Sequence, residues 1–183
     1  MKMRFPLRFL SSTDRFLKRV TVRHLEKDEL QELEWEGEFT HFRQLYSESY
    51  KRMQQGDTIM WVADLDGVGI IGQVFIQLDC GRPELADGRE KAYLYSFRIR
   101  PAFRNLGLGS LILQTVEQDL NERGFLYLTL NVAKENTRAR RLYERHGYRV
   151  VAHEPGIWSY IDNEGRWQHV NEPAWRMIKN IHT

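Results

Sequence analysis

Cysteine is almost absent from this sequence, with Cys80 the only one in 183 residues. A single cysteine excludes both an intramolecular disulfide framework and a multi-cysteine zinc site. His153 and His169 lack metal-ligand spacing with other candidate residues, so we expect no metal site. Because nothing in the chain asks for an oxidising compartment, we expect the protein in the cytoplasm.

Long apolar runs are also lacking, since every candidate is broken by Gln, Asp or Arg well short of the ~20 residues that a membrane span requires. We therefore expect no membrane association. The basic segment 1–18 carries scattered Phe and Leu but no continuous apolar stretch and no cleavage pattern. We expect this segment to be a loose arm that leads into the first strand.

The sequence has no internal repeat, low-complexity tract or Pro/Gly/Ser linker, so residues 19–183 are expected to form one domain. A hydrophobic fraction of 42% is enough to fill its core. The net charge of +2 is too small to indicate nucleic-acid binding by itself. The basic residues between Arg138 and Arg145 suit a solvated helix face or contacts to a phosphorylated cofactor, and we expect no nucleic acid.

The first half of the chain predicts a strand, two helices and a hairpin. Residues 21–25 alternate as in a strand, and the patterns over 26–35 and 39–50 indicate two short amphipathic helices. The β-rich runs TIMWVADL and GIIGQVFIQL are joined through Asp66-Gly67, a dipeptide that favours a type I′ turn. We therefore expect an antiparallel pair here.

The middle of the chain alternates between strand and helix patterns. In AYLYSFRIR we expect Tyr93, Tyr95, Phe97 and Ile99 to share one face of a strand. A helix is predicted from about 109 to Arg123-Gly124, then a strand over FLYLTLNV, then a helix capped by Asn136. This βαβα order predicts a mixed α/β fold with a parallel pair. The tail predicts three further β-prone runs, with a turn over 162–165.

The turn RNLGLGS, between the strand ending at Ile99 and the next helix, has the features of a phosphate site. Backbone N–H groups in the first turn of a helix have no intrahelical partners and meet the positive end of the helix dipole. Glycines at 107 and 109 leave room for an anion, and Arg104 supplies a cation. Two glycines are equally consistent with an ordinary tight turn. Neither GxxxxGK[ST] nor a complete GxGxxG is present.

The wider pattern decides between these two interpretations. Ile99-x-Pro101-x-x-Arg104-x-x-Gly107-x-Gly109 resembles the acetyl-CoA motif of the GNAT superfamily of N-acetyltransferases. The stretch from Asn136 through Ala139, Leu142-Tyr143 and Gly147-Tyr148 is similar to the second motif of that family, in the expected order. The resemblance covers residues 92–150. It implies a mostly antiparallel sheet of about seven strands, with strands four and five parallel and splayed, flanked by about four helices.

The resemblance also implies acetyl-CoA as cosubstrate, bound between the splayed strands and held at its pyrophosphate by the glycine turn. Asn136 and Arg138 would contact it from the following helix. The residues expected at the cofactor are Phe97, Arg98, Ile99, Arg104, Asn105, Leu106, Gly107, Leu108, Gly109, Ser110, Asn136 and Arg138.

In this family an amine attacks the thioester directly, and Tyr143 corresponds to the tyrosine that protonates the departing thiolate. A phenol with an ordinary pKa near 10 is protonated at neutral pH and can act as this acid. Without the motif, Tyr143 would be a simple core aromatic. Some members carry a glutamate as general base where this chain has Tyr93. Glu90, the acidic segment, or Tyr93 and Tyr95 acting through water are alternatives that the sequence leaves open.

The acceptor is expected to be a primary amine of a small molecule or a protein. Seven carboxylates lie between Glu26 and Glu38, where they either attract a cationic amine or form a solvated helix face. The candidate acceptor-site residues are Trp35, Glu36, Glu38 and Tyr93. The alternative function is a non-catalytic acyl-CoA-binding or regulatory module with the same fold.

Four aromatic residues near the C-terminus lie on β-prone runs. They would cover the core, roof the acceptor site or form a homodimer surface, and the sequence does not choose among these. They are Trp158, Tyr160, Trp167 and Trp175.

Overall fold

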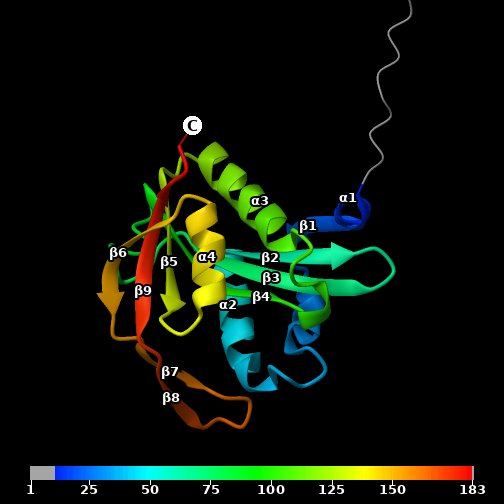
Figure 1. Cartoon of the computed structure of the whole chain (residues 1–183). Coiled ribbons are helices and arrows are strands. Elements are labelled where there is room, and N and C mark those ends of the chain that lie inside the picture. The colour runs from blue at the N-terminus through cyan, green and yellow to red at the C-terminus, as the bar shows by residue number, and fades with distance from the viewer. Residues whose placement is uncertain (1–10, 183) are drawn as a thin grey trace, which may run out of the picture.

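The computed structural model describes residues 11–182, which form a seven-stranded sheet with helices on both faces and a separate two-stranded hairpin (Figure 1). In chain order the elements are α1 (Ser12–Leu17), β1 (Val20–His24), the 3₁₀ helices η1 (Lys27–Glu34) and η2 (Thr40–Phe42), α2 (Arg43–Gln55), β2 (Thr58–Leu65), β3 (Gly69–Gln77), β4 (Lys91–Ile99), η3 (Pro101–Phe103), α3 (Leu108–Glu122), β5 (Tyr127–Ala133), α4 (Thr137–Arg145), β6 (Arg149–Glu154), β7 (Ile157–Ile161), β8 (Trp167–Asn171) and β9 (Ala174–Asn180).

The strand order in the main sheet is β1-β2-β3-β4-β5-β9-β6, and every neighbouring pair is antiparallel except β4 and β5. This confirms the predicted fold class, including the parallel pair at strands four and five. The two faces of the sheet hold separate cores. Helices α3 and α4 pack on one face, where Leu113 of α3 and Leu130 of β5 belong to the core, and α2 with η1 packs on the other around Tyr46 and Phe75.

Helices α3 and α4 begin and end close to where the sequence predicts. Gly107 precedes α3 in the left-handed region with a φ of 78°, and Gly124 follows it at 90°. The Asn136 side chain accepts a hydrogen bond from Ala139 N, which is an N-cap as predicted. Both helices therefore present their N-termini at the end of the sheet where β4 finishes.

Strand β4 contains a bulge that corrects the predicted face pattern. Gln73 pairs with Arg98 and Phe75 pairs with Tyr95, so one residue of β3 opposes two of β4, and Ser96 has a φ of 52°. The extra residue reverses the alternation. Phe97 consequently joins Leu94 in the core beneath α3 and α4, while Tyr95 and Arg98 face α2. The prediction that Phe97 shares a face with Tyr95 is wrong for this reason.

The turn between β2 and β3 is also different from the predicted one. Leu65 pairs with Gly69, which leaves a three-residue loop, and Val68 N donates to Leu65 O at 2.9 Å. Of the Asp66-Gly67 pair, only Gly67 has a positive φ, whereas a type I′ turn requires two. The predicted hairpin is confirmed and its turn type is wrong.

The first predicted helix, over 26–35, is the 3₁₀ helix η1, which ends at Trp35 in the left-handed region with a φ of 46°. The second predicted helix, over 39–50, is displaced toward the C-terminus. It is α2, preceded by the single turn η2. Together these segments form a wall over Tyr95 and Arg98, on the same face of the sheet as those two side chains.

Strands β7 and β8 form a hairpin outside the main sheet, below α2 in Figure 1. The inner side of β7 places Trp158 and Tyr160 against Phe42, with ring centroids 6.4 and 5.0 Å away. Ile157 and Trp167 remain 75% and 65% exposed. The turn predicted at 162–165 is confirmed, because Gly165 N donates to Asp162 O.

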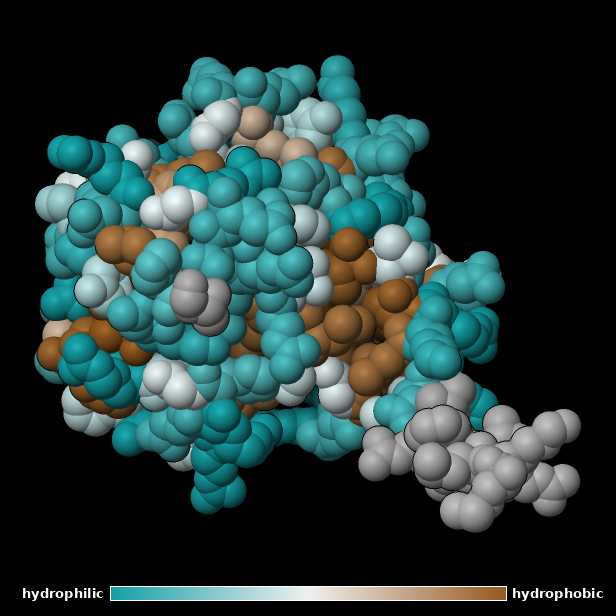
Figure 2. All heavy atoms as spheres, turned by 90° about the horizontal axis from the view of Figure 1, so that it is seen from above, coloured by the Kyte–Doolittle hydropathy of each residue, from teal (hydrophilic) through white to brown (hydrophobic). Residues whose placement is uncertain are grey.

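Residues 12–17 of the segment expected to be a loose arm form helix α1, capped by a reciprocal pair of hydrogen bonds between Ser11 and Asp14. Phe16 stacks on Phe103 with centroids 6.0 Å apart, so α1 is fixed beside the loop that follows β4. The rest of that expectation, over 1–10, falls outside the described residues. Seen from above, the surface is mostly hydrophilic, with one large apolar area and several smaller ones (Figure 2).

Among residues 11–182, the structure has no helix with both the length and the apolar composition of a membrane span. In the same residues, no three His, Cys, Asp or Glu side chains are grouped in a way that would hold a metal ion.

Candidate active site

The pairing between β4 and β5 stops halfway along the strands. It joins Lys91–Leu94 to Tyr127–Leu130, and beyond this point β5 continues to Ala133 paired only with β9. The two parallel strands therefore splay, and backbone groups of β4 from Tyr95 onward face a gap. Asn131 Oδ1, on β5 just past the last pair, is buried without a hydrogen-bond partner in the described residues. An unpaired buried acceptor at this place suits a polar ligand in the gap.

A loop at the far end of the gap presents unpaired backbone donors. None of the N–H groups from Asn105 to Ser110 donates to another group within residues 11–182. Arg104 Nε donates to Ile99 O at 2.8 Å, and Arg138 Nη2 donates to Asn105 Oδ1, which fixes the loop between β4 and α4. Free N–H groups at the start of a 15-residue helix form a site for an anion.

The two glycines of this loop have separate structural reasons. Gly107 adopts a left-handed conformation that other residues rarely adopt, and a Cβ there would lie 3.2 Å from Leu17 Cδ1 of α1. At Gly109 a Cβ would lie 3.1 Å from Leu142 Cδ2 of α4. The absence of Cβ at Gly109 therefore allows α3 and α4 to approach, so the sequence argument, which gave both glycines to the anion, was incomplete.

The remaining loop residues contribute backbone rather than side chains. Leu108 is 1% exposed and belongs to the core, and Leu106 is half-buried. Ser110 Oγ lies 2.8 Å from His146 Nε2 at the end of α4. Only their N–H groups face outward, which suits them to the site as predicted backbone donors.

Tyr143 reaches the splay from the α4 side. It is 6% exposed, with its ring centroid 6.4 Å from that of Phe97 and 5.7 Å from that of Tyr148. Burial raises the pKa of the Tyr143 phenol well above its ordinary value, and the nearby phenol of Tyr93 adds to the effect. Tyr143 therefore keeps its proton at neutral pH, and its ring lies beside Phe97 on the splayed part of β4.

The splayed strands and the glycine turn agree with a comparison of this chain with known protein families. The model of the acetyltransferase (GNAT) family matches residues 24–148, which is more than half of the chain. The chain belongs to the GNAT family. The match extends beyond 92–150, where the sequence motifs lie, into β1, η1 and α2.

Among curated proteins, this GNAT chain is 40% identical over 63 residues to the N-acetyltransferase YdgE of Bacillus subtilis (strain 168), itself uncharacterised. It is 27% identical over 124 residues to a probable N-acetyltransferase, camello, of Xenopus tropicalis. These alignments cover 34% and 63% of this chain and span 40% and 53% of the two relatives' own lengths.

Two solved structures show the same fold. The ribosomal-protein-S18-alanine N-acetyltransferase of Escherichia coli superposes with a TM-score of 0.66 at 20% identity, covering 90% of this chain and 95% of that one. Ard1 of Thermoplasma volcanium gives a TM-score of 0.69 at 16% identity, over 90% of this chain and 99% of that one. At these identities the likeness concerns the GNAT fold alone.

On the other side of the splay from Tyr143 lies Tyr93, the predicted substitute for the family glutamate. Tyr93 stacks on Tyr95 with centroids 6.0 Å apart, and burial raises its pKa to about 12. The charges that act on it come from Arg82 and Glu154, which are bound to each other at 2.8 Å. Glu154 is a buried carboxylate that the sequence reasoning missed, because its partners are distant in the chain.

Glu90 is in the wrong place to serve this GNAT chain as a general base. Its carbonyl accepts hydrogen bonds from Leu126 and Tyr127 N–H groups, at the closed end where β4 and β5 enter the sheet together. The gap lies at the opposite end of β4, so this alternative is excluded by topology.

Three of the seven carboxylates in the acidic segment pair with arginines. Glu29 pairs with Arg23, and Glu34 pairs with Arg43. Glu36, with a side chain 76% exposed, pairs with Arg100 at 2.6 Å. The arginines on neighbouring elements weaken the expected attraction of a cationic amine to this segment.

Of the residues predicted for the acceptor site, Trp35 is 4% exposed and packs beneath Phe39, with centroids 5.0 Å apart. It supports the wall and does not line a surface. Glu38 is exposed and its charge acts on Arg98, although the two form no ion pair. The structure therefore brings Glu38 and Tyr93 to the acceptor side of the sheet and leaves Trp35 and Glu36 outside it.

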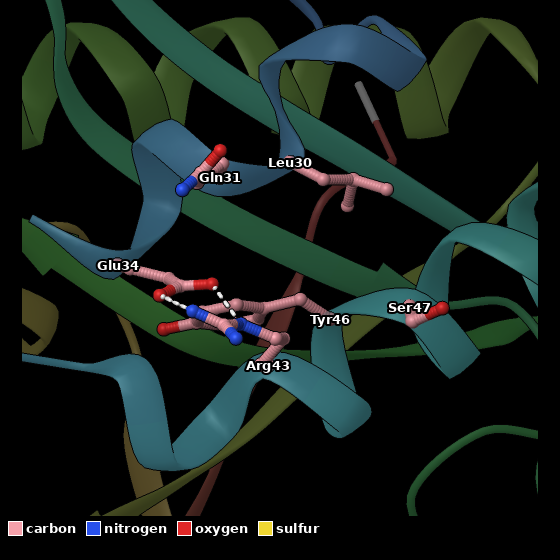
Figure 3. Close-up of a pocket in the computed structure, with 6 residues that line it drawn as sticks. All are labelled: Leu30, Gln31, Glu34, Arg43, Tyr46 and Ser47. Atoms are coloured by element: carbon pink, nitrogen blue, oxygen red, sulfur yellow. Dashed lines mark hydrogen bonds and ion pairs between the residues drawn. The ribbon is translucent and has the colours of Figure 1, made fainter. Parts of the chain in front are cut away.

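A hollow of about 390 Å³ lies between η1 and α2 (Figure 3). Glu34 and Arg43 face each other across it, joined by hydrogen bonds of 2.7 and 2.8 Å, and Arg43 holds the pKa of Glu34 below its usual range. Leu30, Gln31, Tyr46 and Ser47 complete the lining. No residue of β5 or α4 lines it, so this hollow is separate from the splay.

Aromatic side chains form the acceptor wall above the splay. Phe42, from the segment before α2, packs against Trp158 and Tyr160 of β7, and Phe39 stacks on Phe42. Arg98 of β4 lies at their base, with its guanidinium carbon 4.3 and 4.8 Å from the two phenylalanine centroids. The sequence reasoning assigned Arg98 to the cofactor. The bulge turns its side chain away from α3 and α4 toward this wall.

Proposed function

We propose that this chain is an N-acetyltransferase that moves an acetyl group from acetyl-CoA to a primary amine. The observation that carries the proposal is the splay of β4 and β5, with a protonated, buried Tyr143 at its start and unpaired backbone donors at its end. The curated relatives named N-acetyltransferases support the same reaction class.

The residues present fit acetyl-CoA. The donors from Asn105 to Ser110 and the cation of Arg104 would hold the pyrophosphate, and Arg138 would add a second cation from α4. The backbone of Phe97, the N–H of Ile99, whose carbonyl is taken by Arg104, and the unpaired Asn131 Oδ1 would meet the amide groups of the pantetheine arm. Asn136 would act through the cap that it gives α4, because its Oδ1 is used by Ala139 N.

The chemistry requires one proton donor and one proton acceptor. When bound, acetyl-CoA supplies an acyl thioester whose C–S bond breaks as the amine nitrogen bonds to its carbonyl carbon. Tyr143 gives its proton to the leaving sulfur, and its raised pKa means that the proton is present at the start of each turnover. The ammonium group of the acceptor must lose one proton before it attacks, and it loses that proton to solvent water. The attacking nitrogen gives up a second proton as the amide forms, and this proton restores the Tyr143 phenol.

Tyr93 does not take that proton as a base at neutral pH, because it holds its own proton to about pH 12. The amine therefore reacts from its neutral fraction, which is small at pH 7 for an ordinary amine with a pKa near 10. Tyr93 instead borders the place where the amine arrives.

A second candidate is a non-catalytic acyl-CoA-binding or regulatory module. It is favoured by one observation: Tyr93 stands where some relatives have a glutamate, and the nearest buried carboxylate, Glu154, is held by Arg82 and Arg176. Binding of CoA by calorimetry without turnover of any amine would establish this alternative.

The test of the proposed function measures the release of CoA thiol with a panel of primary amines. Tyr143→Phe is expected to reduce kcat by roughly 10²-fold while CoA binding by calorimetry is unchanged, because only the proton is removed. Tyr127→Phe, on β5 at the closed end of the pair, is the matched control and should leave kcat unchanged. Full activity of Tyr143→Phe would show that Tyr143 is not the acid.

We propose that the protein works in the cytoplasm, which agrees with a sequence that contains a single cysteine. Acceptors of either kind, a small molecule or a protein, are compatible with the open wall above the splay. The expectation of no nucleic acid is kept, because arginines of α4 have local partners: Arg138 binds Asn105, and Arg140 binds Glu144.

A further inference from the structure

Arg98 is a half-buried cation on the acceptor side of the splay. The bulge at Ser96 turns its side chain toward α2, where its Nη1 donates to Tyr46 Oη at 2.7 Å. Its guanidinium also lies against the rings of Phe39 and Phe42. The partners of the Arg98 guanidinium are therefore a phenol and two ring faces. None of them carries a negative charge, so this side chain has no counter-ion.

The lack of a counter-ion distinguishes Arg98 from the arginines around it. Arg43, Arg82 and Arg100 pair with Glu34, Glu154 and Glu36. No carboxylate in residues 11–182 lies within 4.0 Å of the Arg98 nitrogens, and Glu38 acts on it only from farther away. Burial lowers the pKa of Arg98, because removing a charge from water without an ion-pair partner disfavours the charged form.

We infer that the amine acceptor carries a carboxylate, and that Arg98 binds this carboxylate while the amine reaches the splay. The inference rests on the proposed function. A guanidinium presents parallel N–H groups that match the two oxygens of a carboxylate, and it binds them more strongly than it binds a phenol. The acceptors of this class are free amino acids and peptides whose first residue has an acidic side chain.

The position of Arg98 along β4 suits this role. The splayed part of β4 begins after Leu94, where the pairing with β5 ends, so Arg98 lies within the splayed part. Tyr93 and Arg98 face the same side of the sheet, one at each end of the acceptor wall. An acceptor bound between them would place its amine near Tyr143 and its carboxylate at Arg98.

The wall indicates the rest of the acceptor. Phe42 lies 6.4 Å from Trp158 and 5.0 Å from Tyr160, centroid to centroid, so β7 adds ring surfaces to the ring that the Arg98 guanidinium contacts. Ring faces and edges favour an apolar or aromatic body beside the carboxylate. We therefore choose L-phenylalanine as the first probe.

The first experiment compares matched acceptors with the unaltered protein. L-Phenylalanine is compared with phenylalaninamide and phenethylamine, which have the same ring and amine without the carboxylate. Glycine, β-alanine and γ-aminobutyrate vary the distance between the two groups, and peptides that begin with Asp or Asn separate a free amino acid from a protein N-terminus.

We expect at least one carboxylate-bearing acceptor to have kcat/KM about 10- to 100-fold above its uncharged partner, the effect of one charged hydrogen-bonded pair. Equal or better turnover of the uncharged partner in every pair would overturn the inference and leave the acetyltransferase proposal intact. If no amine in any pair releases CoA thiol, the proposed function fails and the inference fails with it.

The second experiment changes the arginine. Arg98→Gln should lower kcat/KM for the carboxylate-bearing acceptor about 10- to 100-fold more than for its uncharged partner, so that the preference is lost, and Arg98→Lys should retain part of the preference. Arg149→Gln, at an exposed position on β6, is the control and should change nothing. An equal fall in kcat/KM for the carboxylate-bearing and the uncharged acceptors would show that Arg98 only supports the wall. Should Arg98→Gln not fold, the Lys variant and the unaltered protein still decide.

Discussion

Two tyrosines meet at the point where β4 and β5 separate, one from each face of the sheet. Tyr143 lies in the core under α4, and Tyr93 lies on the α2 side against Tyr95. The family spacing predicted the place of Tyr143 from the sequence, because the helix that carries it is short and well capped. The surroundings of Tyr93 were not predictable, since Arg82 and Glu154 reach it from distant parts of the chain.

The raised tyrosine pKa values predict an unusual pH profile. A raised pKa keeps the proton on the phenol to higher pH, so the acid form of Tyr143 persists where an ordinary tyrosine, with a pKa near 10, would lose it. We expect kcat/KM for a simple amine to rise from pH 7 to about pH 10 as the amine deprotonates, and then to stay level.

Thiol release measured from pH 6 to 11 at constant ionic strength checks this profile. A descending limb with an apparent pKa near 10, present in the unaltered protein and absent in Tyr143→Phe, would contradict the assignment of a raised pKa to that phenol.

At the scale of elements, β4 shows where a prediction from alternating residues in a strand fails. Simple alternation assigned Tyr95 and Phe97 to one face, and one extra residue at Ser96 separates them. A bulge has no strong local signal, because it is fixed by pairing with β3 rather than by its own sequence. Helix caps such as Asn136 and Gly107 were predictable, since their cause lies within a few residues.

The hairpin β7–β8 depends on one close backbone contact at its base. Gly156 has a φ of 68°, and a Cβ there would lie 1.7 Å from Glu172 O. Gly156→Ala is therefore expected to push β7 away from Phe42 and to lower kcat/KM for the amine by roughly 10- to 100-fold, with CoA binding unchanged.

Gly165→Ala, at the tip of the same hairpin, is the control. Gly165 also has a left-handed conformation, with a φ of 81°, but no atom lies within 4 Å of its Cβ position. Its cost should be limited to about 1 kcal/mol of backbone strain, with normal kinetics. Normal acceptor kinetics in Gly156→Ala would show that the hairpin does not position the acceptor.

At the scale of the whole molecule, Glu154 links segments that are distant in sequence. It binds Arg82 of the loop between β3 and β4 and approaches Arg176 of β9 at 3.6 Å. Its side chain is 7% exposed, so Glu154→Gln removes the buried anion that Arg82 and Arg176 share and leaves them only the more exposed Glu84, which should lower the free energy of unfolding by roughly 3 kcal/mol.

Urea unfolding followed by fluorescence measures this change. Glu164→Gln removes a surface ion pair, with a side chain 58% exposed, and should stay within about 0.5 kcal/mol of the unaltered protein. A loss in Glu154→Gln no larger than in Glu164→Gln would mean that the network adds nothing to stability.

The overall architecture was predictable because two family motifs fix the middle of the chain, and a hairpin and strand patterns fix the rest. The arrangement of side chains on the acceptor side of the sheet was not predictable. Arg98 was assigned to the cofactor and Trp35 to the acceptor, and both assignments depend on which way a side chain faces. Homodimer formation, one interpretation of the C-terminal aromatics, stays a prediction, with Ile157 and Trp167 of β7–β8 as its exposed apolar residues.

The strand pairing at the base of the β7–β8 hairpin has a consequence for how the sequence of such proteins can change. Glu154 and Ala174, which flank the hairpin, are direct partners across β6 and β9. Segment 155–173 could therefore be replaced by a short turn, or by a loop of another sequence, without altering the order of the seven-stranded sheet. In evolution and in the laboratory, the hairpin can be exchanged as one insert, which changes the rings beside Phe42 while Arg98 and the β4–β5 splay stay in place.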